Sequence, residues 1–289
     1  MLKNYLSLIK FSHTIFALPF AMVGFFLGTL YLNQSADPML FLLVLFCMVF
    51  ARSAAMAFNR YLDRSIDLEN PRTKAREIPA GILGANKVLI FVLLNCAAFI
   101  LSTYFINALC FSLSPVALLV ILGYSYTKRF TALCHLVLGL GLSLAPIGAF
   151  LAVTGYYAEI PLLFSGVVLL WVGGFDIIYA LQDEEFDQSQ KLLSIPVALG
   201  ARNALWVSKI MHLLSAAILI YAVVQTCQYF QVFDWVIWLG TMCFVVLLMY
   251  QHTLVRYNDL SKVDLAFFTT NGIASLIFGG LFIVDIYLN

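Results

Sequence analysis

The chain has 289 residues, of which 63% are apolar and only 11% are charged. Soluble domains are about 45–50% apolar and about 25% charged, so this composition excludes a soluble enzyme, a disordered chain and a disulfide scaffold. Its 16 Lys and Arg residues nearly balance its 15 Asp and Glu residues, and the net charge of +1 gives no reason to expect nucleic-acid binding. The sequence is typical of a polytopic membrane protein.

Nine apolar segments are candidates for membrane-spanning helices, because a helix needs about 20 residues to cross the hydrocarbon core. In chain order, we expect spans over residues 12–33, 39–59, 88–107, 112–128, 132–154, 160–181, 204–226, 233–250 and 265–287, of which only the fourth is short. The first segment is too long for the core of a secretory signal peptide and has no small-residue cleavage site. The expected fold is an all-α bundle of nine transmembrane helices in one domain, residues 1–289.

The basic residues indicate which connections face the cytoplasm. Fifteen of the sixteen lie before the first span or around alternate connections, and the exception, Arg52, lies inside the second span. Because cytoplasmic loops are enriched in Lys and Arg, we expect a cytoplasmic N-terminus, an outer C-terminus and a bacterial inner membrane. The two long connections on this side, residues 60–87 and 182–203, would form a cytoplasmic cap. The six cysteines form no C-x-x-C and lie in or beside apolar segments, so we expect free thiols.

Polar residues follow one helical face where the second span ends, in RSAAMAFNRYLDRSID. Arg52, Asn59, Asp63 and Asp67 are separated by seven, four and four residues, which keeps them on one side of a helix. Arg52 lies about two turns inside the span. A charge there costs several kcal/mol, so the side chain needs an anionic partner inside the bundle, either Asp176 or an anionic substrate.

The sixth span ends with a similar cluster, in DIIYALQDEEFD. Asp176, Asp183 and Asp187 repeat the separation of seven and four residues. Each lies 124 residues after Arg52, Asn59 and Asp63, respectively, which suggests an internal repeat that brings the two clusters face to face.

Carboxylates four residues apart on a helix repel each other unless a cation lies between them. Mg²⁺ is typically held by one or two carboxylates together with substrate phosphates, so two facing clusters favour a Mg²⁺–diphosphate site over solvated helix ends. The segment YSYTKRF adds Tyr124 and Lys128, four residues apart at the end of the fourth span. They are either interfacial anchors or further contacts to a diphosphate.

These segments resemble the UbiA superfamily of membrane-embedded aromatic prenyltransferases. The resemblance rests on NRYLDRSID, the basic loop ending in REIPAG, YSYTKR, and DIIYALQDEEFD followed by SIP, and it covers nearly the whole chain. The segments IKFSHTIFALPFA and FDIIYALQDEEFD are most similar to the bacterial 4-hydroxybenzoate polyprenyltransferase branch, part of which is associated with menaquinone synthesis.

The resemblance implies a Mg²⁺-dependent transfer of a polyprenyl group from polyprenyl diphosphate to a ring carbon of a hydroxyaryl carboxylic acid. The acid would be 4-hydroxybenzoate in ubiquinone synthesis or, alternatively, a dihydroxynaphthoate in menaquinone synthesis. The lipid bilayer is the other expected partner, and the oligomeric state stays open.

The matched motifs also imply roles for individual residues. The residues that would bind the metal and its diphosphate are Asn59, Asp63, Asp67, Asp183 and Asp187. The diphosphate would also be held by Arg64, Arg76, Tyr124 and Lys128. The acceptor would be contacted by Arg52 and Lys10. Asp176 and the released diphosphate are both candidates for the base that removes the ring proton. Two positions depart from the pattern of many relatives: Arg60 replaces an Asp, and Lys10 replaces an Arg.

Two other classes of membrane protein fit less well. A transporter would place its polar residues near the midplane at broken helices, whereas here they gather at one interface. A CDP-alcohol phosphotransferase would carry D-G-x-x-A-R, which this sequence lacks.

Overall fold

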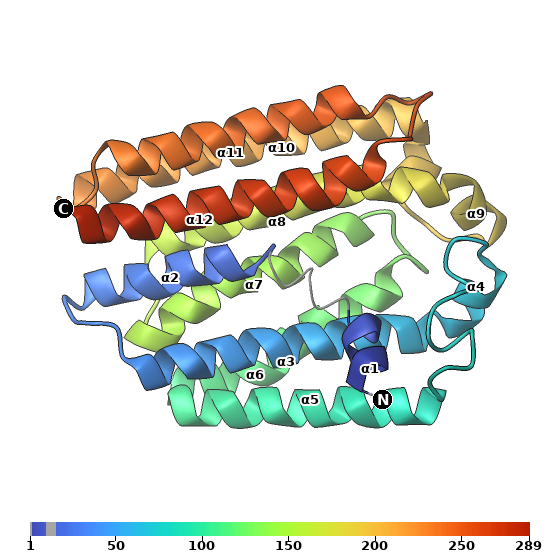
Figure 1. Ribbon diagram of the computed structural model, residues 1–289, viewed down its shortest axis with the longest axis horizontal. Helices are drawn as coiled ribbons and strands as arrows, with labels where there is room; N and C mark the ends of the chain where they lie inside the picture. Colours follow the sequence, from blue (N-terminus) through green and yellow to red (C-terminus); the bar gives the residue numbers. More distant parts are fainter. Residues whose placement is uncertain (1, 10–15) are drawn as a thin grey trace.

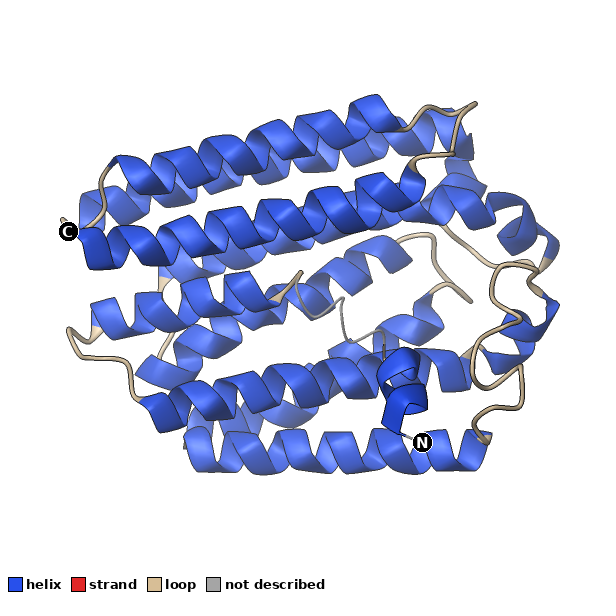
Figure 2. Ribbon diagram, viewed as in Figure 1, coloured by secondary structure: helices blue, strands red, loops and turns tan. Residues whose placement is uncertain are grey.

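The computed structural model describes residues 2–9 and 16–289, and within them it contains helices and loops but no named strand (Figure 2). The α-helices are α1 (Leu2–Leu8), α2 (Leu18–Tyr31), α3 (Pro38–Leu62), α4 (Arg64–Glu69), α5 (Ala85–Ile106), α6 (Ala108–Thr127), α7 (Cys134–Thr154), α8 (Glu159–Ala180), α9 (Glu184–Ser189), α10 (Ile195–Tyr229), α11 (Trp235–Leu254) and α12 (Asn271–Leu288). A 3₁₀ turn, η2 (Leu181–Asp183), precedes α9, and a π-helical segment, η3 (Leu265–Thr270), precedes α12.

Eight helical segments in the described part of the chain are long and apolar enough to cross a membrane. They correspond to the second to ninth predicted spans, and the predicted short fourth span is the 20-residue helix α6. The first predicted span, 12–33, begins outside the described residues, and its described helix α2 has 14 residues. Such a helix is about 21 Å long at 1.5 Å per residue, less than the roughly 30 Å of the hydrocarbon core. The structure therefore supports a multi-pass membrane protein with eight full-length spans. The first predicted span, 12–33, stays a prediction.

The long helices run side by side along the longest axis of the molecule (Figure 1). The helix α8 packs against α7 and α10, α3 packs against α5, and α2 packs against α7. The buried core between them is rich in aromatic rings, among them Phe20, Phe164, Trp171 and Phe278. The contact between α7 and α8 therefore joins the N-terminal helices, up to α7, to the C-terminal helices, from α8 onward.

Small residues allow some of these helices to approach closely. A Cβ atom on Gly139 of α7 would lie 2.3 Å from the carbonyl oxygen of Leu169 on α8. A Cβ atom on Gly24 of α2 would lie 2.0 Å from the carbonyl oxygen of Pro146 on α7. Close backbone contact of this kind is a common basis of helix association in membranes, where burial of apolar surface gives little driving force.

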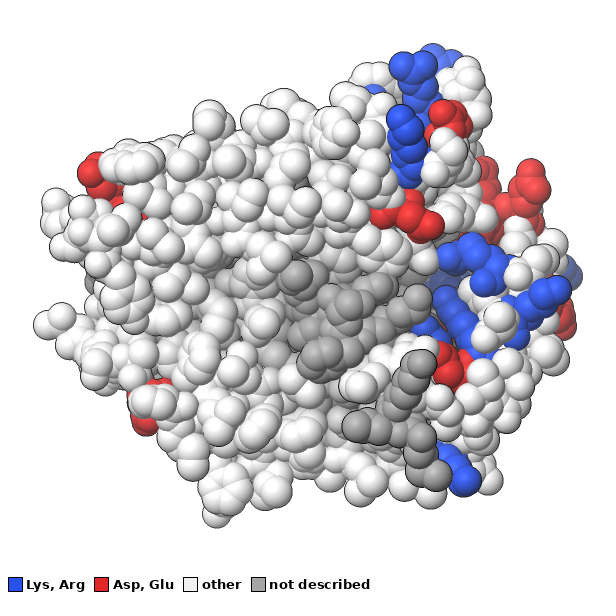
Figure 3. Space-filling view, viewed as in Figure 1, with Lys and Arg blue, Asp and Glu red and all other residues white. Residues whose placement is uncertain are grey.

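Charged side chains gather at one end of the molecule, the end at which α4 and α9 lie (Figures 1 and 3). The C-terminus lies at the opposite end. The structure thus confirms that the polar chemistry is concentrated at one end, while the assignment of that end to the cytoplasm remains a prediction.

The two expected clusters occupy equivalent local structures. The helical hydrogen bonds continue across the junction of α3 and α4, because Asp63 N–H donates to the Asn59 carbonyl at 2.9 Å and Asp67 N–H donates to the Asp63 carbonyl at 2.7 Å. In the second half, α8 continues through η2 into α9, and α4 and α9 each have six residues. The expected internal repeat is therefore visible as a long spanning helix followed by a short helix in each half.

Candidate functional site

Asp63 is the most enclosed carboxylate of the charged end, with 2% of the residue exposed. Lys128 Nζ lies 2.9 Å from one of its oxygens, and Arg129 Nη2 lies 2.7 Å from the other. The Asn59 amide donates to the same carboxylate at 3.3 Å. A buried carboxylate needs charged partners of this kind to stay ionised. Lys128 thus reaches the first cluster as expected, and Arg129 is an additional contact.

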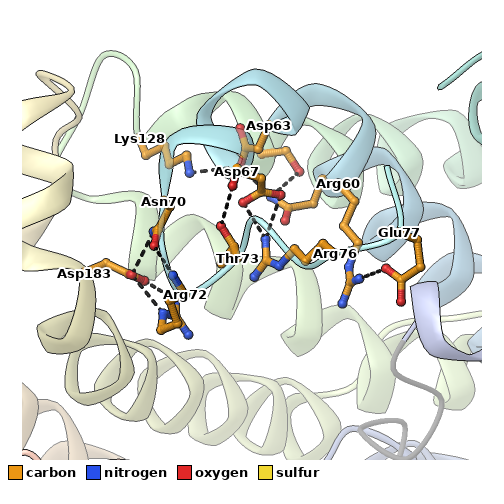
Figure 4. Close-up of polar contacts among 12 residues, drawn as sticks. Arg60, Asp63, Asp67, Asn70, Arg72, Thr73, Arg76, Glu77, Lys128 and Asp183 are labelled. Atoms are coloured by element: carbon orange, nitrogen blue, oxygen red, sulfur yellow. Dashed lines mark hydrogen bonds and ion pairs between the residues drawn. The ribbon is translucent and has the colours of Figure 1, made fainter. Parts of the chain in front are cut away.

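Asp67 and Asp183 each pair with an arginine from the loop that follows α4 (Figure 4). Arg76 Nη1 donates to both oxygens of Asp67, at 2.8 and 2.9 Å. Arg72 binds Asp183 through two nitrogens, with Nε at 2.9 Å from Oδ1, and also donates to the Tyr179 hydroxyl at 2.8 Å. Burial alone would lower the pKa of Arg72, but the contacts with Asp183 outweigh burial and raise it.

The pair between Arg72 and Asp183 joins the two long connections. Asn70 strengthens this junction, because its amide donates to Asp183 at 3.2 Å, and Gln190 donates to Glu69 at 2.8 Å. The loop after the first cluster therefore contacts the second cluster directly.

Asp187 is half-buried. It forms no ion pair within 4 Å with any residue among 2–9 and 16–289. Its electrostatic neighbours are Lys128, Asp183, Arg72 and Asp63. Asp187 and Asp63 thus share Lys128 as a neighbour, which means that the two clusters lie face to face as the spacing predicts.

Arg60, the residue that departs from the family pattern, forms its ion pair outside this set of carboxylates. It is 4% exposed and forms an ion pair with Glu77, which is 8% exposed and accepts a hydrogen bond from the Ser7 hydroxyl at 2.6 Å. Burial would raise the pKa of Glu77, but the hydrogen bond from Ser7 and the pairing with Arg60 lower it. Arg60 therefore connects α3 to the following loop and, through Glu77 and Ser7, to α1, and it forms no ion pair with Asp63 or Asp67.

A cavity of about 500 Å³ lies within the bundle, bounded mainly by α3, α5, α6 and α7. Its described walls are almost wholly apolar, and Arg52 is their one charged residue. Arg52 Nε is buried and has no hydrogen-bond partner in the described structure. Tyr124 lines the same cavity, and its electrostatic neighbours are Asp63, Asp176 and Arg52. Tyr124 thus lies where the apolar cavity meets the charged cluster.

Asp176 is paired with a histidine rather than with Arg52. His135 Nδ1 lies 2.7 Å from Asp176 Oδ2, and His135 Nε2 accepts a hydrogen bond from Ile195 N–H at 3.3 Å. Because Nε2 accepts, Nδ1 carries the proton and donates to Asp176. A permanent Arg52–Asp176 pair, one of the two partners expected for Arg52, is therefore wrong for this structure. The reason is that α7 supplies a closer partner, His135, which no local pattern in the sequence indicates.

Most of the predicted site residues lie in or beside this region, with two exceptions. Arg64 is exposed, donates to the Tyr61 carbonyl at 2.6 Å and stacks on the Tyr61 ring, so it makes no contact with the carboxylates. Lys10 lies outside the described residues. Sequence reasoning missed Arg72, Arg129 and His135 as contacts, although the first two belong to the basic segments that it did single out.

The donor set fits Mg²⁺. No group of three or more His, Cys, Asp and Glu side chains lies close enough to hold a metal ion among residues 2–9 and 16–289. Such a group is not required, because Mg²⁺ is commonly held by one or two carboxylates, with substrate phosphates and water completing the shell. Asp63, Asp67, Asp183 and Asp187 all offer the hard oxygen ligands that this ion prefers.

The family model described as "UbiA prenyltransferase family" matches residues 17–273. A 4-hydroxybenzoate octaprenyltransferase from Nitrosomonas europaea is 29% identical over 254 residues, which are 87% of this chain and 84% of the relative.

Solved structures share the fold. The apo structure of a UbiA homolog from Aeropyrum pernix K1 superposes with a TM-score of 0.84 at 30% identity, covering 95% of this chain and 98% of that one. A UbiA homolog from Archaeoglobus fulgidus, bound to GPP and Mg²⁺, has a TM-score of 0.74 at 18% identity and covers 98% of this chain and 99% of that one.

Proposed function

This protein belongs to the UbiA prenyltransferase family and is a prenyltransferase, and we propose that it transfers a polyprenyl group from polyprenyl diphosphate to a ring carbon of 4-hydroxybenzoate. The observation that carries the proposal is the position of the charged cluster beside the apolar cavity, with Tyr124 at their junction. The names of the curated relatives support 4-hydroxybenzoate as the acceptor.

The cluster has the composition needed to bind a diphosphate together with a metal ion. When bound, Mg²⁺ would supply Lewis-acid stabilisation of the leaving diphosphate, held by Asp63, Asp67, Asp183 and Asp187. The basic side chains around these carboxylates would take the charge that develops on the diphosphate as the prenyl carbon departs. These cations are Arg72, Arg76, Lys128 and Arg129.

The cavity would hold the prenyl chain and the aromatic ring away from water. Departure of the diphosphate leaves an allylic cation, which water would destroy, so an apolar enclosure is part of the chemistry. Arg52 can orient the acid because its planar guanidinium can form two parallel hydrogen bonds with a carboxylate. Its unpaired Nε is consistent with a partner that arrives with the substrate.

Asp176 is the group we assign to removal of the ring proton. His135 binds Oδ2 and fixes the carboxylate, while Oδ1 has no hydrogen bond to the described residues. The side chain is 22% exposed, and Asp176 is an electrostatic neighbour of Tyr124, which lines the cavity. The proton would pass from the ring carbon to Oδ1 after the new carbon–carbon bond has formed.

The proposal is tested by incubating membranes that contain the protein with a polyprenyl diphosphate, Mg²⁺ and one aromatic acid. We expect a prenylated 4-hydroxybenzoate, identified by mass spectrometry, and little product from 1,4-dihydroxy-2-naphthoate. Product from the naphthoate alone would show that the dihydroxynaphthoate, and not 4-hydroxybenzoate, is the acceptor. Absence of product from either acid, with the protein correctly inserted, would refute it.

A further inference from the structure

A second pocket, of about 410 Å³, lies between α10 and α11, apart from the cavity described above. Its described lining includes Arg202, Trp206 and Lys209 of α10, His252 of α11, and Arg256 with Tyr257 in the turn that follows. These residues belong to the first part of α10, the end of α11 and the turn after it, at the end of the molecule where the charged side chains gather (Figures 1 and 3). Nothing in the proposed transfer reaction uses these residues.

The three cations of this pocket lack an ion-pair partner among the described residues. No carboxylate in the described part of the chain forms an ion pair with Arg202, Lys209 or Arg256, whereas the cations of the first site are paired. Lys209 stacks at 4.9 Å on the Trp206 ring. Asp259 is close to Arg256, but its Oδ1 already accepts two hydrogen bonds from Ser261. Three like charges around one pocket favour an anion inside it.

The adjacent helix ends do not change this balance. The helical path of α10 breaks at Gly200, whose φ of +76° favours glycine, so a new helical start lies next to Arg202. That end carries about half a positive charge, and the nearby C-terminus of α11 carries about half a negative charge. These two contributions roughly cancel, and the three formal charges decide the sign.

His252 adds a hydrogen-bond acceptor. His212 Nε2 donates to the Trp171 carbonyl at 3.1 Å, so His212 Nδ1 must accept. It accepts from His252 Nε2 at 2.8 Å, which leaves Nδ1 of His252 as an acceptor. That atom is buried and has no partner in the described structure. A ligand with a hydroxyl group would satisfy it.

The aromatic residues indicate the depth of the pocket. Trp206 and Tyr257 are 58% and 59% exposed, and such rings concentrate at the level of lipid headgroups. Basic pockets between transmembrane helices at this level recognise anionic headgroups. A zwitterionic headgroup would bring an ammonium group beside three cations and is disfavoured.

We propose that this pocket binds the headgroup of an anionic glycerophospholipid that carries one phosphate and a free hydroxyl, of the phosphatidylglycerol type. Arg202, Lys209 and Arg256 surround the phosphate, and His252 Nδ1 accepts from the hydroxyl. The lipid then bridges α10 and α11 and reduces the repulsion among the three cations, so it stabilises this part of the bundle.

The test measures lipid retention by native mass spectrometry and the apparent Tm of the full chain in detergent. Phosphatidylglycerol, phosphatidylcholine, phosphatidylmethanol and inorganic phosphate are added separately. The double variant Lys209→Gln/Arg256→Gln removes two cations of the pocket. The matched control, Lys74→Gln/Lys87→Gln, removes the same charge from exposed residues elsewhere.

We expect phosphatidylglycerol to be retained by the wild type and the control and to raise their Tm. The double variant should bind it about 25-fold more weakly, at about fivefold per cation. The single variant Arg256→Gln, at about fivefold, provides the comparison should the double variant unfold. Phosphatidylmethanol, which has the same charge but no free hydroxyl, should bind more weakly than phosphatidylglycerol.

Several results would overturn the proposal. Equal stabilisation by phosphatidylcholine would show that the pocket does not select an anion, and full retention by the Arg256→Gln variant would show that the lipid binds elsewhere. Equal binding of phosphatidylmethanol would refute the hydroxyl contact with His252. The same rise in Tm from inorganic phosphate would assign the pocket to a small anion instead of a lipid.

Discussion

Two arginines on the same helix, the half-buried Arg52 and the buried Arg60 of α3, give a sharp test of how the site works. Arg60 is paired with Glu77, whereas Arg52 lines the apolar cavity and its buried Nε has no partner among the described residues. We therefore predict opposite effects of the same substitution. Arg60→Met should destabilise the protein and Arg52→Met should not, while Arg52→Met should abolish efficient use of the aromatic acid.

The magnitudes follow from the partners. Removing Arg60 leaves the Glu77 carboxylate, which is 8% exposed, without its cation; breaking a buried pair in this way costs about 3–5 kcal/mol of unfolding free energy. Removing Arg52 leaves no unpaired anion and removes the cost of a desolvated charge, so the unfolding free energy should stay level or rise. For activity, Arg52→Lys keeps the charge but loses one of two charged hydrogen bonds. That loss is about 1.5–3 kcal/mol, or about 10- to 150-fold in kcat/KM.

The assay combines thermal unfolding in detergent with kcat/KM for the acid at a fixed concentration of polyprenyl diphosphate. The four proteins are the wild type, Arg52→Met, Arg52→Lys and Arg60→Met. The reasoning is wrong if Arg52→Met lowers the apparent Tm as much as Arg60→Met does. It is also wrong if Arg52→Lys retains full efficiency, because the contact to the substrate would then not need a planar guanidinium.

Three further predictions address the metal site, the Glu77 pair and the topology. Asp187→Ala should reduce turnover on the order of 10³-fold. It should not lower Tm, because Asp187 forms no ion pair in the described structure. EDTA should abolish wild-type activity until Mg²⁺ is restored, and activity of Asp187→Ala within tenfold of the wild type would contradict this role. The pKa of Glu77 is lower in the folded protein than its unfolded value of about 4.3, so its contribution is present above that pH and is lost as the pH falls through the folded pKa. The Tm advantage of the wild type over Glu77→Gln should accordingly shrink below about pH 4, and a gap that persists at lower pH would argue against it. A reporter fused after Asn289 should be active on the outer side of the membrane, and one inserted after Lys74 should be active in the cytoplasm.

The sequence predicted the helices and the stripe of acidic residues well, because both depend on local patterns. Apolar segments of about 20 residues identify spans independently of their packing. The spacing of Asn59, Asp63 and Asp67 fixes their common face because helical hydrogen bonds continue from α3 into α4. The first predicted span, 12–33, corresponds only in part to the 14-residue helix α2, and its residues 12–15 lie outside the described ranges.

Contacts between helices were harder to predict, and Asp176 shows why. Arg52 and Asp176 occupy equivalent positions in the two halves, which made them natural partners on charge and depth. The actual partner of Asp176, His135, lies in the first turn of α7, at the start of a mainly apolar segment. Which of the two reaches Asp176 depends on the rotation of α7 against α8, and that rotation is set by packing at residues such as Gly139. A local pattern carries no information about it.

The pairing of the charged cluster explains how one site can remain folded without substrate and still bind a highly charged one. Four carboxylates, Asp63, Asp67, Asp183 and Asp187, lie among four cations, so the cluster is formally neutral as it stands. In the proposed reaction, a prenyl diphosphate with Mg²⁺ would bring ligands of both signs together. The carboxylates would hold the metal in place of arginine or lysine, and the released cations would bind the diphosphate oxygens. Binding would then replace the existing ion pairs with others instead of creating unpaired charge, which would keep the cost of desolvation low at the edge of an apolar cavity.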